Sequence, residues 1–351
     1  MKETFYRTLS WLHTWAGLLV CWVLLLIFFA GSLSYFRHEI SLWNEPELHK
    51  GVYQDYRADT LENQLDKGQS YIEAHSPATA QRWMIGFPTE RTPFQSVSWQ
   101  LPPEKGQRRG KTEEHVALAD GSGMISEVRE SRGGDFFYRL HFDLHYMSAI
   151  TARYIVGVCT MFMLIALISG IVIHKRIFKD LFSFRRDKGA RSWLDAHNVS
   201  SVIALPYHLM ITYTGLITLM LIYIPWTVNT AYSGDNQALL KELNPARHTE
   251  KAAGISAPQV QLSQLLPQVK AAWGDAPIKQ VIVSYPKDQN SQVTFYQNTG
   301  KDVTDEANIL IFNGVNGELK YASPHEASGA SATYDTMMSL HTARFAAPLL
   351  R

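Results

Sequence analysis

The sequence predicts a membrane α+β protein, in which a bundle of transmembrane helices carries two small domains of helix and sheet outside the membrane. Two observations predict this fold class. Three long runs of the chain contain no Asp, Glu, Lys or Arg, and two long polar segments repeat one order of expected helix and strands. The mean hydropathy of -0.13 averages over this segregation and resembles that of a soluble protein.

The three uncharged runs cover residues 14–36, 154–173 and 198–234. A helix rises about 1.5 Å per residue, so about 20 apolar residues cross the hydrocarbon core of a membrane, and each run reaches this length. The first run follows Lys2 and Arg7 and could instead be a cleaved signal peptide, with small residues at 30–32. We favour a retained anchor because the apolar stretch exceeds the roughly 7–15 residues of a signal peptide.

The charge of the short connection after the second run predicts the orientation. It carries seven Lys or Arg residues and two Asp residues over 175–191. Short loops rich in Lys and Arg stay in the cytoplasm. The N-terminus then lies in the cytoplasm too, and the polar segments 37–145 and 229–340 are translocated. We therefore expect a multi-pass protein of the bacterial inner (cytoplasmic) membrane with two periplasmic segments. Neither segment contains Cys, so no disulfide links them.

The two polar segments look like diverged copies of one unit. Alternation of apolar and polar residues favours strands in both. Each segment shows a helix, three strands and an Asx-Gly turn, which is the content of a small αβββ domain with a one-sided sheet. The alternative is a coincidence of short strands. The expected elements are the helix 60–75 with a cap at Asp59 or Thr60, strands 82–87, 95–101 and 115–119 and the turn 120–123, then the helix 263–273, strands 279–285, 292–297 and 308–312 and the turn 313–317.

Histidines gather where the runs meet the expected membrane surfaces. His208 lies 11 residues past His197, which is about 16 Å along a helix and near mid-membrane. Polar side chains inside a membrane are costly and indicate function. Neutral imidazole ligates haem iron, and two histidines on facing helices can hold a b-type haem between them. The candidates are His13, His174 and His197 on the cytoplasmic side, His141, His145 and His341 on the outer side, and His208 between them.

A flat macrocycle needs room beside its ligand, and a small residue lies one turn deeper than most of these histidines. For the three inner ones these are Gly17, Gly170 and Ser201, and for His145 it is Ala149. An interfacial His can instead snorkel to the headgroups, and small residues also occur at ordinary helix contacts. The matched depths of seven histidines favour shared haem ligation, with His13 and His197 preferred for the inner site. Copper or zinc is disfavoured because the runs contain no Asp or Glu.

Four stretches of the sequence resemble one known family. They are LSWLHTWAGLL around His13, RLHFDLHYMSAITARYIVG before the second run, the long stretch from SGIVIHKRIF to YHLMITYTGL, and SLHTARFAAPLLR at the end. The chain is similar to the PepSY-associated transmembrane proteins, which include inner-membrane ferric-siderophore reductases. The resemblance implies four transmembrane helices, two periplasmic PepSY-like domains and two haems b. We therefore expect a first helix in 1–36, a PepSY-like domain in 37–140, a second helix in 141–174, a basic loop in 175–196, a third helix in 197–228, a second PepSY-like domain in 229–340 and the start of a fourth helix in 341–351.

In the family the chain continues after the FAAPLLR-like stretch into a fourth helix, whereas this sequence stops at Arg351. Residues 342–351 span less than half a membrane, so alone they cannot anchor His341. We expect this form to bind the outer haem weakly or not at all, and a form extended by an apolar helix to bind two haems.

The expected activity is a ferric-chelate reductase that relays electrons to a ferric siderophore. No GxGxxG motif is present, and the cytoplasmic loop is short, so membrane quinol or a cytoplasmic reductase would be the electron donor. The near-neutral net charge argues against nucleic acid as a partner. Two alternatives stay open: a PepSY membrane protein that binds or regulates a peptidase, and a protein that assists siderophore transport.

Overall fold

A computed structural model gives the structure of the protein. It describes residues 2–52, 59–104, 110–119, 121–125, 128–129, 131–174, 176–177, 179, 184–224, 226–243, 251–297, 308–323 and 329–343. The chain divides into two units. The membrane unit comprises residues 1–35, 135–235 and 333–351, and the sheet unit comprises residues 36–134 and 236–332.

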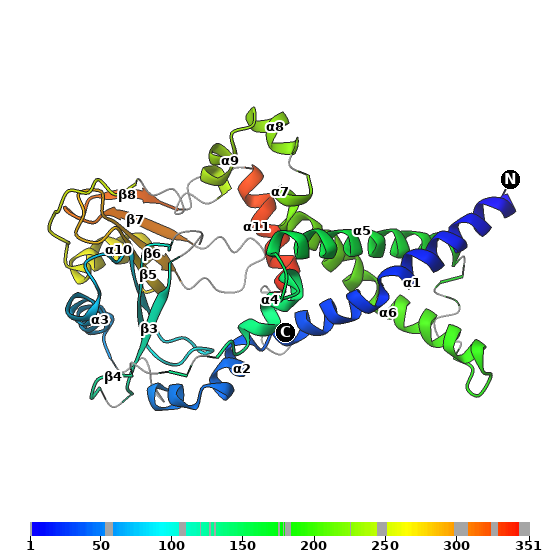
Figure 1. Ribbon diagram of the computed structural model, residues 1–351, viewed down its shortest axis with the longest axis horizontal. Coiled ribbons are helices and arrows are strands. Elements are labelled where there is room, and N and C mark those ends of the chain that lie inside the picture. Colours follow the sequence, from blue (N-terminus) through cyan, green and yellow to red (C-terminus); the bar gives the residue numbers. More distant parts are fainter. Residues whose placement is uncertain are drawn as a thin grey trace. The chain divides into compact units, whose positions relative to one another are not determined.

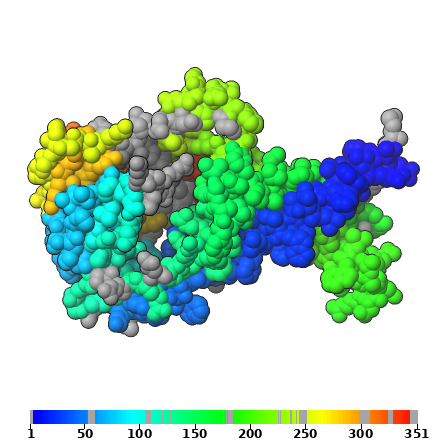
Figure 2. All heavy atoms as spheres, viewed as in Figure 1, coloured from blue at the N-terminus to red at the C-terminus, as the bar shows by residue number. Residues whose placement is uncertain are grey.

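Three helices of the membrane unit are long and apolar enough to cross a membrane: α1 (Lys2–Ser34), α5 (Ala149–Ile173) and α6 (Ala190–Thr218). In the same unit, α1 lies alongside α5 (Figures 1 and 2). Their apolar side chains are exposed over much of the surface, as expected of helices that face lipid. The chain is therefore a membrane protein, as the three uncharged runs predicted.

Three of the expected boundaries in this unit differ from those in the structure. Helix α6 begins at Ala190, inside the basic segment expected as a loop over 175–196, and it ends at Thr218. The third uncharged run is therefore not one helix, because the short helices α7 (Met220–Tyr223) and α8 (Trp226–Tyr232) follow α6 within it. The outer domain was expected to begin at residue 37 and extend to 140, but α4 (Asp135–Asp143) belongs to the membrane unit.

The sheet unit contains one antiparallel sheet of eight strands in the order β4-β3-β2-β1-β5-β6-β7-β8 (Figure 1). The first four strands are β1 (Arg82–Gly86), β2 (Ser96–Gln100), β3 (Thr112–Ala117) and β4 (Met124–Ile125). The last four are β5 (Ile278–Ser284), β6 (Gln292–Gln297), β7 (Ile309–Asn313) and β8 (Leu319–Ala322). Each group of four is a meander, and β1 pairs with β5 in the middle of the sheet.

The repeat predicted from the sequence is present, but its two copies share one sheet. In each copy a helix precedes the strands: α3 (Leu61–His75) in the first, and the 3₁₀ turn η3 (Leu262–Leu265) with α10 (Leu266–Trp273) in the second. Thr60 caps α3 by accepting a hydrogen bond from the Asn63 backbone N–H. A fourth strand follows each turn, which the sequence analysis missed because β4 and β8 have two and four residues.

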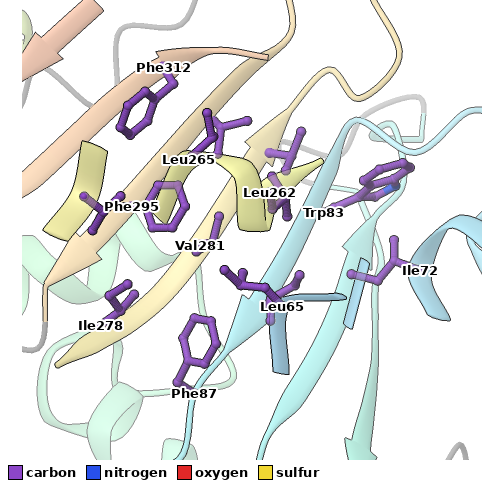
Figure 3. Close-up of a cluster of buried hydrophobic side chains, with 14 of the residues drawn as sticks. Leu65, Ile72, Trp83, Phe87, Leu262, Leu265, Ile278, Val281, Phe295 and Phe312 are labelled. Carbon is purple, nitrogen blue, oxygen red and sulfur yellow. The ribbon is translucent and has the colours of Figure 1, made fainter. Parts of the chain in front are cut away.

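One hydrophobic core joins the two copies (Figure 3). The helices contribute Leu65, Ile72, Leu262 and Leu265, and the strands contribute Trp83, Val281, Phe295 and Phe312. The Gln69 side chain is buried, accepts a hydrogen bond from the Leu262 backbone N–H at 2.8 Å and donates one to the Val260 carbonyl at 3.3 Å. These bonds tie α3 of the first copy to the segment that begins the second copy.

The remaining elements are short. Helix α2 (Arg37–Asn44) and the 3₁₀ turn η1 (Pro46–Gly51) begin the sheet unit, and α9 (Asn236–Leu243) begins its second segment. Helix α11 (Gly329–Thr342) carries His341 near its end. Residues 329–340, expected in the second outer domain, therefore form a helix. The rest of the expected fourth transmembrane helix, residues 344–351, lies outside the described residues.

Candidate functional site

Two pairs of histidine rings lie in the membrane unit. In the inner pair, His13 on α1 and His197 on α6 have ring centroids 6.1 Å apart and an interplanar angle of 67°. The His13 Nδ1 lies 2.8 Å from the Ala166 carbonyl oxygen of α5 and 3.3 Å from the Ser169 Oγ. A carbonyl only accepts hydrogen bonds, so Nδ1 carries the proton and Nε2 of neutral His13 carries the lone pair.

A glycine on the facing helix makes room for this ring. A Cβ placed on Gly170 would lie 3.1 Å from the His13 Cε1, which is tighter than an ordinary contact. The sequence analysis assigned Gly170 to His174 on its own helix and Gly17 to His13. In the structure a Cβ at Gly17 would meet nothing within 4 Å, so the residue that accommodates His13 lies across the helix interface.

In the outer pair, His141 on α4 and His341 on α11 have ring centroids 6.0 Å apart and an interplanar angle of 41°. The His141 Nδ1 lies 2.8 Å from the Ile27 carbonyl oxygen of α1, so its Nε2 also carries the lone pair. A Cβ at Gly31 of α1 would lie 2.8 Å from this same Nδ1. Any larger residue at this position would push the imidazole away.

His341 packs in the same way against α6. Its Nδ1 lies 3.0 Å from the Thr214 Oγ1, and a Cβ at Gly215 would lie 3.1 Å from its Cε1. His197 and Thr214 are 17 positions apart on α6, or roughly 25 Å along the helix axis. The inner pair therefore includes a residue near one end of α6, and the outer pair contacts a residue near the other end of this membrane-crossing helix.

The spacing within each pair fits two imidazoles that share one metal ion. A metal–nitrogen bond is about 2 Å long and the ring centre lies about 1 Å beyond the nitrogen, so two such rings have centroids about 6 Å apart. Both planes then contain the metal–nitrogen axis, so any angle between them is allowed. The described residues contain no group of three or more His, Cys, Asp or Glu side chains that could hold a metal.

The other three candidate histidines do not join these pairs. His145 was expected one helical turn after His141, but α4 ends at Asp143 and His145 has a φ of 46°. Its Nε2 donates to the Phe136 carbonyl at 2.8 Å, and its ring stacks on Phe136 at 4.6 Å. This bond occupies Nε2 of His145, which is the nitrogen that His13 and His141 leave free.

His174 and His208 also lie apart from the pairs. His174 immediately follows the last residue of α5, and within the described part of the chain no ring contact joins it to His13 or His197. His208 lies within α6, where its ring contacts the edge of Phe28 at 5.3 Å.

Ion pairs brace the elements that carry the paired histidines. Near the outer pair, Asp143 of α4 is buried and accepts from the Arg153 Nε of α5 at 2.8 Å. Near the inner pair, the buried Asp195 of α6 accepts from the Arg185 Nε and Nη2, each at 2.7 Å. Charged hydrogen bonds of this kind fix orientation, and here they fix the helix ends next to His141 and His197.

Sequence reasoning missed three residues of these sites. Gly31, Gly215 and Thr214 each contact a paired histidine, and none was selected. The available signal was a small residue inside an apolar run, but in each case this residue lies on a different helix from the histidine that it contacts. Helix-to-helix contacts depend on the rotation of each helix, which the sequence pattern leaves open.

The comparison with known families covers nearly the whole chain. The model of a family described as PepSY-associated TM region matches residues 10–351. Among curated proteins the search found no match.

Proposed function

Since the chain belongs to the family of PepSY-associated transmembrane proteins, we propose that it is a b-type cytochrome of the bacterial inner membrane. It carries electrons across the membrane and reduces a periplasmic ferric chelate of the siderophore type for iron uptake. The observation that carries this proposal is the presence of two facing histidine pairs, with centroid spacings of 6.1 and 6.0 Å, at opposite ends of α6.

The residues of both pairs fit haem b. His13 and His197 would hold one group, and His141 and His341 the other. Bound haem supplies reversible exchange of one electron between the ferric and ferrous states of its iron. His13 and His141 each donate Nδ1–H to a main-chain carbonyl, which fixes the tautomer and leaves Nε2 free for the metal. Gly170 and Gly31 hold these rings at the helix surface because no side chain displaces them.

The proposed reaction takes one electron for each ferric ion. A quinol in the membrane would release two electrons and two protons and so reduce two ferric ions. The alternative electron donor is a cytoplasmic reductase. Siderophore oxygens are hard donors that prefer Fe(III), so reduction to Fe(II) weakens the chelate and releases the iron. The reaction needs no nucleophile or general acid from the protein, and the proposal assigns the chelate to the periplasmic sheet unit.

An absorption spectrum with a haem count tests the first half of this proposal. The purified protein should show the sharp visible bands of a reduced b-type haem. In a form extended by an apolar helix, which is expected to bind two haems, alanine variants of His13, His197, His141 and His341 should each lose about one haem equivalent in a pyridine haemochrome measurement. His145→Ala and His174→Ala are the matched controls, which should keep the haem content of the wild type. The assignment fails if the control variants lose haem and the paired ones do not.

A reductase assay tests the second half. The protein is reduced under anaerobic conditions and mixed with a ferric siderophore, and Fe(II) is trapped by a chromogenic ferrous chelator. We expect one ferrous ion for each electron stored. A protein that binds haem yet releases no ferrous iron would favour the other reading of the family, a PepSY membrane protein that regulates a peptidase or assists siderophore transport.

A further inference from the structure

Three of the four paired histidines, namely His13, His141 and His341, differ in what accepts a hydrogen bond from the second ring nitrogen. For His13 and His141 the Nδ1 partner is a main-chain carbonyl, at 2.8 Å in both cases. For His341 one partner is a side chain, the Thr214 hydroxyl, at 3.0 Å, and the Ile211 main chain is a second partner. A side-chain partner can be removed by substitution, whereas a carbonyl cannot.

The geometry around Thr214 determines the direction of this bond. Its Oγ1 lies 2.7 Å from the Met210 carbonyl oxygen, one turn earlier on α6, and 3.3 Å from the Ile211 carbonyl oxygen. The hydroxyl has one proton, and both carbonyls can only accept, so this proton points to the main chain. The oxygen lone pairs then remain for the imidazole, and His341 donates its Nδ1–H to Thr214.

The site around this bond is closed. Thr214 is 1% exposed, so water does not compete for its hydroxyl. Gly215, the next residue, leaves the space that the ring occupies, since a Cβ there would lie 3.1 Å from the His341 Cε1. One turn of α6 thus provides both the room for the imidazole and the acceptor for its N–H.

We propose that Thr214 is a positioning residue for the outer histidine pair. It holds His341 in the tautomer that carries its lone pair on Nε2, and it sets how strongly this nitrogen donates to a metal. The part of this inference that concerns the metal rests on the function proposed above, whereas the part that concerns the tautomer holds for the protein alone.

The consequence for a bound metal follows from ligand basicity. An imidazole that donates a hydrogen bond gains electron density and stabilises the ferric state more than the ferrous state. Without the hydrogen-bond acceptor, the Nε2 of His341 becomes a weaker electron-pair donor to the metal. The reduction potential of the outer site should then rise, and metal-group affinity should fall by about 10-fold or more, as is typical when such partners are removed.

The test compares three substitutions on α6. Thr214→Val removes the hydroxyl and keeps the branched shape, and Thr214→Ser restores it. Thr212→Val is the matched control, because Thr212 is 3% exposed and its Oγ1 has no hydrogen-bond partner among the described residues. Redox titration, haem content and the low-spin electron paramagnetic resonance signal are measured for each variant.

We expect Thr214→Val alone to raise the potential of one haem, to shift its resonance signal and to lose that haem at lower concentrations of added imidazole. Thr214→Ser should return all three values to those of the wild type. Wild-type values in Thr214→Val would overturn the inference, since they would mean that the Ile211 main chain, which already bonds His341, is sufficient to hold the imidazole. Equal changes in Thr212→Val would also overturn it, since they would show a general effect of α6.

A haem-free readout separates this inference from the proposed function. Nitrogen NMR shifts of the histidine rings report the tautomer in protein prepared without haem. We expect His341 to be protonated at Nδ1 in the wild type and to become a mixture of tautomers in Thr214→Val. If the wild type binds no haem, the proposed function fails, and this spectrum still decides the role of Thr214.

Discussion

At the scale of single residues, the glycines of the membrane helices determine where the histidine rings can lie. Gly31, Gly170 and Gly215 each face an imidazole from a different helix. A Cβ would lie 2.8 Å from the ring at Gly31, where something would have to move, and 3.1 Å from it at Gly170 and Gly215, which is a tight contact. Small residues let membrane helices and their side chains approach closely. Here they admit a ring between helices and hold it without a covalent or ionic contact.

Replacing Gly31 by Ala should therefore disrupt the outer pair. The new Cβ would lie 2.8 Å from the His141 Nδ1 and would break its bond to the Ile27 carbonyl. In the form extended by an apolar helix, we expect loss of about one haem equivalent, measured per polypeptide. Gly17→Ala on the same helix is the control, because a Cβ there meets nothing within 4 Å. Equal haem content in both variants would contradict this account.

A second prediction at this scale concerns His115 in the sheet unit. Burial lowers the pKa of His115 below its ordinary value, while Glu113 acts in the opposite direction and His75 in the same one. The Tyr71 hydroxyl lies 3.0 Å from its Nδ1, and the ring stacks on Trp99 at 4.7 Å. Since the unfolded chain takes up the proton first, the free energy of unfolding should fall as pH decreases from about 6.5 towards the lowered pKa.

The thermal unfolding midpoint of the whole protein, measured at several pH values from 7.5 to 5, checks this. His115→Phe keeps an aromatic ring beside Trp99 and removes the titrating group, so its midpoint should depend less on pH than that of the wild type. Burial also lowers the pKa of His38, so part of the dependence should remain. An unchanged dependence in His115→Phe would exclude His115 as a source.

The histidines show how far a sequence alone can identify such a site. Charge and depth selected all four paired histidines together with three others, and His13 and His197, which were preferred for one site, have neighbouring rings in the structure. The same criteria also selected His145, whose ring is turned towards Phe136 by a backbone with positive φ. Pairing depends on helix rotation and on where α4 ends, which hydropathy does not report.

At the scale of elements, the seam between β1 and β5 is the main feature that the sequence did not predict. The helix–strand order of both copies was recognised, and β6 was predicted with its correct bounds. However, β1 and β5 lie far apart in the sequence, and nothing in either strand marks it as an edge or a centre. Their pairing, with Ile85 opposite Val281, makes the two expected domains into one sheet.

Because the two copies share one sheet, a substitution that destabilises one copy should also destabilise the other. Phe295 of β6 is fully buried and packs edge-on against Phe312 at 5.7 Å. Phe295→Ala should cost about 3–5 kcal/mol of unfolding free energy. Hydrogen exchange should show that β2 and β6 lose protection together. Leu319→Ala on β8, where the side chain is 41% exposed, should change stability by less than about 0.5 kcal/mol. Retained protection of β2 would mean that the copies unfold as separate domains.

At the scale of the whole molecule, the direction of the proposed electron flow depends on which side of the membrane each histidine pair faces. The inner pair includes His197, near the basic residues that precede and begin α6, and Thr214 beside the outer pair lies near its other end. Arg186, Lys188 and Arg191 are exposed. Positive residues near helix ends are retained in the cytoplasm. We therefore expect the His13–His197 pair at the cytoplasmic face, with the sheet unit in the periplasm.

Cysteine labelling in a background without Cys21 and Cys159 checks this topology. The probes are Arg186→Cys beside α6, Glu62→Cys on α3 and Gln289→Cys between β5 and β6, at positions that are all exposed. In cells with a permeabilised outer membrane, an impermeant maleimide should label residues 62 and 289. Residue 186 should be labelled only after the inner membrane is broken, because the energetic cost of moving its cationic neighbours across the membrane keeps it inside. Labelling of residue 62 only in broken cells would reverse the orientation and place both the sheet unit and its proposed ferric substrate in the cytoplasm.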